Sequence, residues 1–152
     1  MKNISTFGIW ANTDKKSFWR VFPDILLWSK SKNITPHITE RIIKHPNFKT
    51  KNLGDINNIE DLNDVDFILV LGGDGTFLSL ARKMKNCNTP ILGVHLGDLG
   101  FLAKVTLNDL FHRLDQVALG DFILEDRILL QSKIKKSETE LKYYALNDFV
   151  IS

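Results

Sequence analysis

Residues 72–76, Gly-Gly-Asp-Gly-Thr, combine residue types that bind phosphate with one that carries a negative charge. Glycines let the backbone turn tightly and approach an anion closely, and the free N–H groups at a helix start bind phosphate. Thr76 can cap that helix or donate its hydroxyl to a phosphate. Asp74 differs, because its carboxylate repels phosphate. It suits a site where a carboxylate holds a metal ion or takes a proton from a hydroxyl group beside the phosphates.

A second glycine turn repeats part of this pattern. Residues 73–78 and 97–102 share Gly-Asp-x-x-Phe-Leu. Parallel strands end at one edge of a sheet, so two such turns can meet in one crevice. Asp98 then competes with Asp74 as the reactive carboxylate, and the richer glycine context favours Asp74. The alternatives are a plain tight turn capped by Asp74 and a chance repeat of turn-forming residues, because short motifs carry false-positive risk.

Other residues offer less chemistry. The sequence contains neither G-x-x-x-x-G-K-[ST] nor G-x-G-x-x-G, so it has no P-loop and no standard dinucleotide fingerprint. A single cysteine, Cys87, excludes an internal disulfide and a cysteine-based metal site. The histidines show no metal-ligand spacing, and we therefore expect no metal site made by the chain itself. Only His95, beside the second turn, merits a test, and a structural role is the more common one.

Composition narrows the class of protein. The chain has 152 residues, 43% of them hydrophobic, with 20 Lys+Arg against 18 Asp+Glu and a net charge of +2. This suits one globular domain, or one domain and part of another. No basic run indicates a nucleic-acid partner. No signal peptide or membrane-length apolar run is present, so we expect a cytoplasmic protein that has no membrane partner.

The elements around the first turn are the clearest. Residues 67–71 are continuously apolar, which is typical of a parallel strand buried on both faces. Phe77, Leu80 and Met84 follow at helical spacing. Residues 90–94 predict another strand, which leads into the second turn.

The flanking segments extend this alternation of strand and helix. Residues 4–10 predict an opening strand, and an apolar face from Phe18 to Ile25 predicts a helix, with a break or kink near Phe22 because Pro23 follows. Residues 34–51 suggest a short strand and a short helix, and residues 52–64 a polar connection. Thr106 and Asp109 resemble a capping box opening a last helix with apolar positions 107, 110, 114 and 117 inward. The predicted fold is α/β with a parallel sheet.

The pattern changes after Gly120. Residues 121–134 and 141–151 predict two consecutive strands around a polar turn at 135–140. A change from alternating to consecutive strands often marks a new domain. We therefore expect an α/β nucleotide-binding domain over residues 1–120, and the first strands of a truncated β-rich domain over residues 121–152.

Three segments together resemble the N-terminal half of the NAD kinase family: FILVLGGDGTFLSLARKM at 67–84, TPILGVHLGDLGFLAKV at 89–105 and YYALNDFVIS at 143–152. Gly-Gly-Asp-Gly-Thr alone is shared with diacylglycerol and sphingosine lipid kinases. The Gly-x-Leu-Gly-Phe-Leu pattern at 97–102 and Ala-Leu-Asn-Asp at 145–148 are more particular to NAD kinases.

The resemblance implies transfer of the ATP γ-phosphate to the adenosine-ribose 2′-hydroxyl of NAD, which makes NADP. It implies that Asp74 is the general base, that Mg²⁺ or another divalent cation accompanies ATP, and that the complete protein is a homo-oligomer. The residues that it implies at the NAD and ATP sites are Gly72, Gly73, Asp74, Gly75, Thr76, Phe101, Asn147 and Asp148.

The chain departs from the family's usual pattern at three positions. His95 stands where bacterial members usually carry Asn, Asp148 replaces the commoner Glu, and Ser79 lies where many members place a basic residue. Two alternatives stay open. One is a lipid kinase of the diacylglycerol type, although residues 89–102 lack the Pro-x-Gly-Thr-x-Asn-Asp-like segment of those enzymes. The other is a nucleotide-binding fragment that is inactive because the chain is incomplete.

Overall fold

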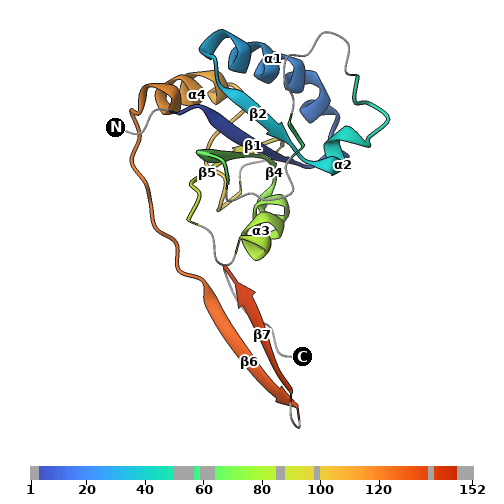
Figure 1. Cartoon of the computed structure of the whole chain (residues 1–152), viewed down its shortest axis with the longest axis vertical. Helices are drawn as coiled ribbons and strands as arrows, with labels where there is room; N and C mark the ends of the chain where they lie inside the picture. The colour runs from blue at the N-terminus through green and yellow to red at the C-terminus, as the bar shows by residue number, and fades with distance from the viewer. Residues whose placement is uncertain are drawn as a thin grey trace.

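The computed structural model describes residues 4–49, 57–58, 64–84, 88–97, 100–136 and 139–146 (Figure 1). Along the chain the elements are β1 (Thr6–Ala11), α1 (Lys16–Lys32), β2 (Thr35–Ile38), α2 (Glu40–Ile43), β3 (Asn57–Asn58), β4 (Phe67–Gly72), α3 (Asp74–Lys83), β5 (Ile91–His95), α4 (Leu110–Leu119), β6 (Leu130–Lys136) and β7 (Thr139–Ala145).

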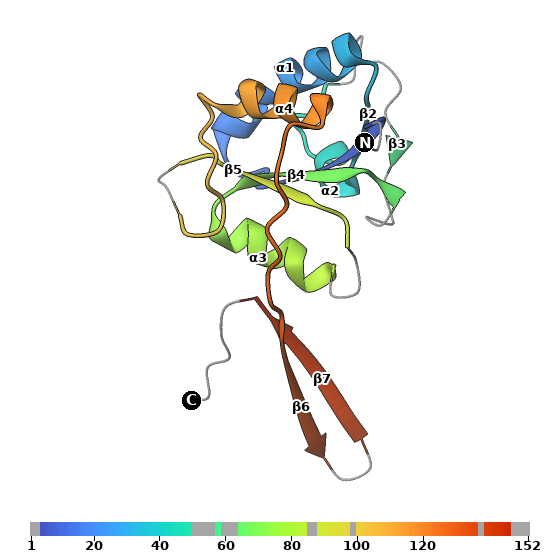
Figure 2. The same ribbon diagram turned by 90° about the vertical axis from the view of Figure 1, so that its left-hand side faces the viewer.

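The main sheet is parallel and has the strand order β3-β2-β1-β4-β5. The α/β fold with a parallel sheet is thus confirmed. Figure 2 shows α1 and α4 on one face of the sheet and α3 on the other. The chain runs outward from β1 to β3 and then returns to place β4 on the other side of β1. This reversal creates a switch point between β1 and β4, where open α/β sheets bind ligands beyond the strand ends.

Strand β4 is the centre of the core. All six of its residues are buried, as the continuous apolar run predicts. Its odd-numbered residues join the cluster formed with α1 and α4, whereas Ile68 and Val70 face α3 and pack with Leu80 and Met84. Strand β4 thus has two apolar faces and pairs with β1 on one side and β5 on the other. These contacts fix the position of Gly72, its last residue.

Helix α1 corrects one prediction. It is continuous through Pro23, so the expected break does not occur. A proline inside a helix costs about 3 kcal/mol, because it removes one hydrogen bond and crowds the preceding turn. Large apolar side chains are buried on both sides of it, and each stabilises the fold by roughly 1.5–3 kcal/mol. These side chains are Phe18, Phe22, Ile25 and Leu26. Their combined burial outweighs the cost of the proline.

Helix α4 starts later than the capping box predicts. It begins at Leu110, although Asp109 N–H does donate to Thr106 Oγ1 at 3.4 Å. The Thr106 hydroxyl donates to the Asp109 carboxylate at 2.8 Å, so that carboxylate does not reach back to the Thr106 N–H as it would in a capping box. The expected apolar positions 107, 110, 114 and 117 do pack inward, against the α1 side of the core.

The segment after α4 also differs in part from expectation. Strands β6 and β7 form the expected antiparallel hairpin, and Figure 1 shows it projecting beyond α3, away from the sheet. Residues 121–129, however, form no strand, and residues 121–128 are exposed. They have no neighbouring strand to pair with in the described part of the chain. The two-residue β3 likewise falls inside the expected polar connection and pairs with β2. Among the described residues, no helix has the length and apolar character needed to cross a membrane.

Candidate functional site

The loops that follow β1, β4 and β5 meet at one edge of the sheet. Gly72, the last residue of β4, pairs with His95, the last residue of β5. The N–H of Asn12, just after β1, donates to Leu71 O at 2.8 Å. The N–H of Leu96 donates to Gly72 O at 3.2 Å and so holds the start of the third loop against β4. Three loops therefore surround the switch point of the sheet.

Helix α3 begins directly after β4 and places Asp74 in its first turn. Gly73 is the N-cap, and its carbonyl accepts the N–H groups of Thr76 and Phe77 at 2.9 and 3.2 Å. The half-buried carboxylate of Asp74 thus lies at the positive end of the helix dipole. The expected strand-turn-helix geometry is thus present, but the expected caps are not, because the N-cap is Gly73 and neither Asp74 nor Thr76.

The second glycine turn closes onto Asp74. Phe101 N–H donates to Asp74 Oδ2 at 3.0 Å, and Leu102 N–H donates to Oδ1 at 3.1 Å. The expectation that the two turns meet is therefore confirmed. These two hydrogen bonds are the main cause that lowers the pKa of Asp74 below its usual 3.8, while partial burial acts in the opposite direction. Asp74 is a carboxylate at neutral pH.

This arrangement leaves Asp74 able to accept more than the two backbone bonds. An ionised carboxylate has about four lone-pair positions, and the bonds from Phe101 and Leu102 use one on each oxygen. A hydroxyl group of a bound molecule can therefore donate to either oxygen. The turn orients the carboxylate and keeps it charged without blocking it.

The glycines of the site fall into two kinds. A Cβ on Gly72 would collide with the Thr76 side chain, and one on Gly100 would collide with the Asp74 carboxylate and lie 2.8 Å from His95 Cε1. Gly73 and Gly75 instead face open space. Neither Gly73 nor Gly75 has a positive φ. Packing thus explains Gly72 and Gly100, whereas no protein atom of the described residues occupies the space beside Gly73 and Gly75.

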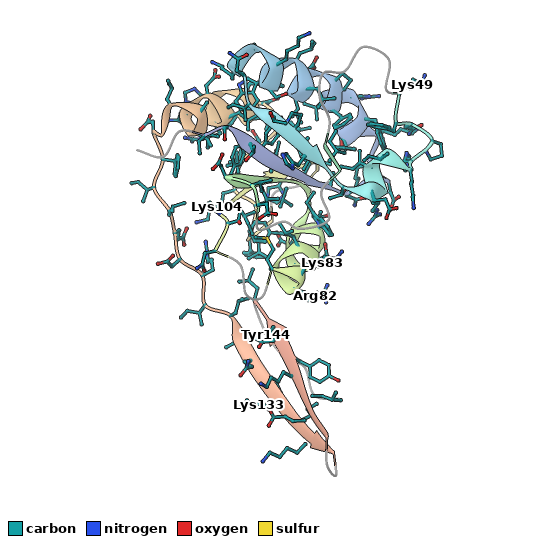
Figure 3. All side chains as sticks on the ribbon, in the orientation of Figure 1. Lys49, Arg82, Lys83, Lys104, Lys133 and Tyr144 are labelled. Carbon is teal, nitrogen blue, oxygen red and sulfur yellow. The ribbon has the colours of Figure 1, made fainter. Side chains whose placement is uncertain are left out.

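Ser79 makes internal contacts. Its hydroxyl accepts Trp10 Nε1–H at 3.0 Å and donates to Thr76 O at 2.7 Å. The Trp10 ring also lies under Lys83, whose Nζ is 5.0 Å from the ring centroid; Figure 3 labels Lys83 near the end of α3. The hydroxyl of Ser79 thus connects the first turn of α3 to Trp10 of β1. A basic residue at this position, as in many family members, would provide a positive charge instead.

Of the remaining predicted site residues, only Phe101 lies in the described part of the chain. Phe101 lies in the turn that contacts Asp74, and its side chain is 89% exposed. Asp98, Asn147 and Asp148 lie outside the described residues. Within the described part of the chain, no three His, Cys, Asp or Glu side chains are grouped so that they could hold a metal ion.

Comparison with known proteins gives the family. The ATP-NAD kinase N-terminal domain model matches residues 9–122, which is most of the chain. The chain belongs to this family. The NAD kinase of Citrifermentans bemidjiense is 32% identical to the chain over 153 aligned residues, and the match covers 100% of this chain and 52% of that protein. The NAD kinase of Syntrophotalea carbinolica is 33% identical, with the same coverage of 100% and 52%.

A solved structure supports the fold. The crystal structure of yeast NADH kinase complexed with NADH superposes with a TM-score of 0.82 at 18% identity, and covers 97% of this chain and 48% of that chain. The chain therefore spans about half the length of the NAD kinases that it matches.

The sequence-based expectations do not include one contact of this site. His95 is 3% exposed, and its Nε2 accepts the Gly100 N–H at 3.0 Å. The sequence does contain a signal for it, because His95 closes a strand and begins the loop that returns to Asp74. No spacing rule, however, predicts which ring nitrogen meets which backbone group.

Proposed function

We propose that the protein transfers the γ-phosphate of ATP to the 2′-hydroxyl of the adenosine ribose of NAD, forming NADP and ADP. Membership of the ATP-NAD kinase family supports this assignment. The observation that carries it is the Asp74 carboxylate, held in the first turn of α3 beside two glycines that face open space. A phosphate group and a hydroxyl group can both approach such a site.

Asp74 is the proposed general base. The ribose 2′-oxygen attacks the γ-phosphorus, a new O–P bond forms, the bond from that phosphorus to ADP breaks, and the hydroxyl proton passes to Asp74. The two backbone N–H groups hold the carboxylate in one orientation, so the hydroxyl meets a positioned acceptor. The hydrogen bonds to its charged form keep the pKa of Asp74 below its usual value, so the side chain is a carboxylate at neutral pH.

The glycine loop is the proposed phosphate-binding element. Gly73 and Gly75 let phosphate oxygens approach the first-turn N–H groups of α3, and Thr76 offers a hydroxyl beside them. Gly72 contributes by leaving room for the Thr76 side chain. Phe101, Asn147 and Asp148 are the proposed NAD contacts, of which Phe101 is largely exposed and donates its backbone N–H to Asp74.

Mg²⁺ or another divalent cation is the proposed companion of ATP. The described residues contain no group of three ligands that would hold a metal ion by themselves. Mg²⁺ at phosphoryl-transfer sites keeps several waters and is bound largely by the substrate phosphates, so it does not need a cage of protein ligands. Its role is to neutralise the phosphate charge when ATP is bound.

The setting of this site is also part of the proposal. Residues 1–120 form the nucleotide-binding domain, and residues 121–152 begin a β-rich second domain. The many exposed apolar side chains beyond residue 120 support this division. We further propose a homo-oligomeric cytoplasmic enzyme with no nucleic-acid or membrane partner.

The test is the formation of NADP. The 152-residue chain and the complete translation product of its gene are each incubated with ATP, Mg²⁺ and NAD, and NADP is measured with an NADP-specific dehydrogenase. We expect NADP from the complete product, and the 152-residue chain shows how much of the activity this part carries alone. If neither protein forms NADP, the proposal is wrong. Phosphorylation of diacylglycerol without NADP would instead support the lipid-kinase alternative.

A further inference from the structure

His95 makes a specific contact next to the proposed base. It ends β5 on the face of the sheet that carries α3, and it is almost fully buried. Its Nε2 accepts the N–H of Gly100 at 3.0 Å. The two residues after Gly100 are the ones whose N–H groups bind Asp74. Three consecutive N–H groups of one turn are thus paired with two side chains.

The hydrogen bond defines the protonation state of the ring. Nε2 must carry a lone pair to accept from Gly100, so the ring is neutral and its proton lies on Nδ1. Nδ1 is buried and has no hydrogen-bond partner among the described residues. Leaving a buried N–H unpaired is unfavourable. Because Nδ1–H has no partner in the described part of the chain, the hydrogen bond from Gly100 to Nε2 is the contact that selects this tautomer.

The packing around Gly100 shows that this geometry is tight. A Cβ at Gly100 would collide with Asp74 Oδ1, and would lie 2.7 Å from Asp74 Cγ and 2.8 Å from His95 Cε1. The backbone of the turn thus lies directly against both side chains. A small displacement of Gly100 would move the N–H groups of Phe101 and Leu102 away from the carboxylate.

We propose that His95 is a positioning residue: its Nε2 holds Gly100 so that the next two N–H groups orient the Asp74 carboxylate for proton abstraction. His95 itself touches neither substrate in this account. The inference rests on the proposed function for its kinetic consequence, but the contact between the turn and Asp74 can be measured without turnover.

A pair of variants isolates the acceptor. In His95→Gln the side-chain oxygen can take the place of Nε2, whereas His95→Met has similar length and volume but no strong acceptor. His112→Gln, at an exposed position of α4, is the control. If His95→Met does not fold, His95→Leu takes its place in the comparison.

The first readout is amide hydrogen exchange at residues 100–102 in the 152-residue chain, measured by NMR without ligand. We expect protection at Phe101 and Leu102 to fall about tenfold in His95→Met, the effect of losing roughly one hydrogen bond. His95→Gln and His112→Gln should stay close to wild type. Equal loss in His95→Gln and His95→Met would overturn the proposal, because imidazole packing and not the acceptor would then matter. Unchanged protection in His95→Met would also overturn it.

The second readout is NADP formation by the complete translation product. In His95→Met we expect kcat to fall about 10²-fold, as for a misplaced catalytic group, with KM values for ATP and NAD changed only a few-fold. His95→Gln should restore most of kcat. A fall in His95→Met that His95→Gln does not restore contradicts the proposal. If wild type forms no NADP, the proposed function fails, and amide exchange still decides the role of His95.

Discussion

Strand β4 and the hairpin β6–β7 lie in the same chain but differ in what surrounds them. Every residue of β4 is buried between two layers of helices. None of the hairpin residues whose side chains are described is buried, and Ile134, Leu141 and Tyr143 are each about half exposed. Figure 3 shows Lys133 on the hairpin, away from the sheet, and Lys83 near the end of α3.

This difference in burial shows which parts of the described chain pack in a core and which do not. The parallel sheet completes a core and holds the ends of β4 and β5, so the loops around Asp74 are positioned by buried neighbours. A two-stranded hairpin without a covering layer is marginally stable in water. The exposed apolar side chains of the hairpin and of residues 121–129 therefore contribute little to the stability of the protein.

The largest expected effect is on the free energy of unfolding when an apolar side chain is shortened to alanine in β4 and, for comparison, in the hairpin. Leu69→Ala in β4 removes a fully buried side chain and should lower the free energy of unfolding by about 2–5 kcal/mol. Ile134→Ala in β6, where the side chain is 52% exposed, should change it by about 0.5 kcal/mol or less. Urea unfolding followed by circular dichroism measures both. Similar losses for the two variants would show that the hairpin has a core of its own.

A second contrast lies within the site. Gly100→Ala should destabilise the protein by about 1–3 kcal/mol, because its Cβ collides with Asp74. Gly73→Ala, where a Cβ meets no protein atom, should leave stability nearly unchanged. Thermal unfolding of the two variants checks the difference. Equal destabilisation would mean that the loop around Gly73 is packed more closely than the structure shows.

Gly75→Ala separates stability from function. Alanine has a higher helix propensity than glycine, and a Cβ at this position of α3 has free space, so the variant should be more stable by about 0.5–1 kcal/mol. If Gly75 serves close approach of a phosphate, the same variant should have a higher KM for ATP. Unfolding curves and ATP titrations of NADP formation test the two halves. A stabilised variant with unchanged KM would remove Gly75 from the proposed phosphate site.

The smallest expected effect is a dependence of stability on pH. The pKa of Asp74 is lowered in the folded protein, so its charged form adds stability that is present above about pH 4, the unfolded value being 3.8. That contribution is lost as pH falls through the lower folded pKa. The stability difference between wild type and Asp74→Asn should therefore shrink below pH 4. A difference that stays constant from pH 7 to pH 3 would contradict the contacts with the turn.

The elements that the sequence predicts well are those with one dominant cause. Residues 67–71 are apolar throughout, which is typical of a strand buried on both faces, and they form such a strand. The expectation of a break or kink near Phe22 was wrong as to the break, because burial on both sides of Pro23 keeps the helix continuous. The strand expected over residues 121–134 begins only at Leu130, where β7 lies beside it, because residues 121–129 have no partner strand among the described residues.

The candidate site likewise has features that the sequence predicts and contacts that it does not. Residue types alone indicated that Asp74 and its glycines could act on a phosphate and a hydroxyl group, and the repeated motif indicated that a second turn would meet them. The hydrogen bonds from Phe101 and Leu102, and the contact of His95 with Gly100, depend on the relative placement of β4, β5 and the loop after β5. Tertiary packing determines such distances, and no local pattern encodes them.

The most direct test of the account is a comparison of kcat and NAD affinity in Asp74→Asn, with Asp24→Asn on the exposed surface of α1 as the control. Both are made in the complete translation product. If Asp74 is the base, its variant should lose about 10²–10⁴-fold in kcat while the Kd for NAD, from calorimetry, changes only a few-fold. The control should match wild type in both quantities. An Asp74→Asn enzyme that keeps its kcat, or that loses only NAD binding, would contradict the account.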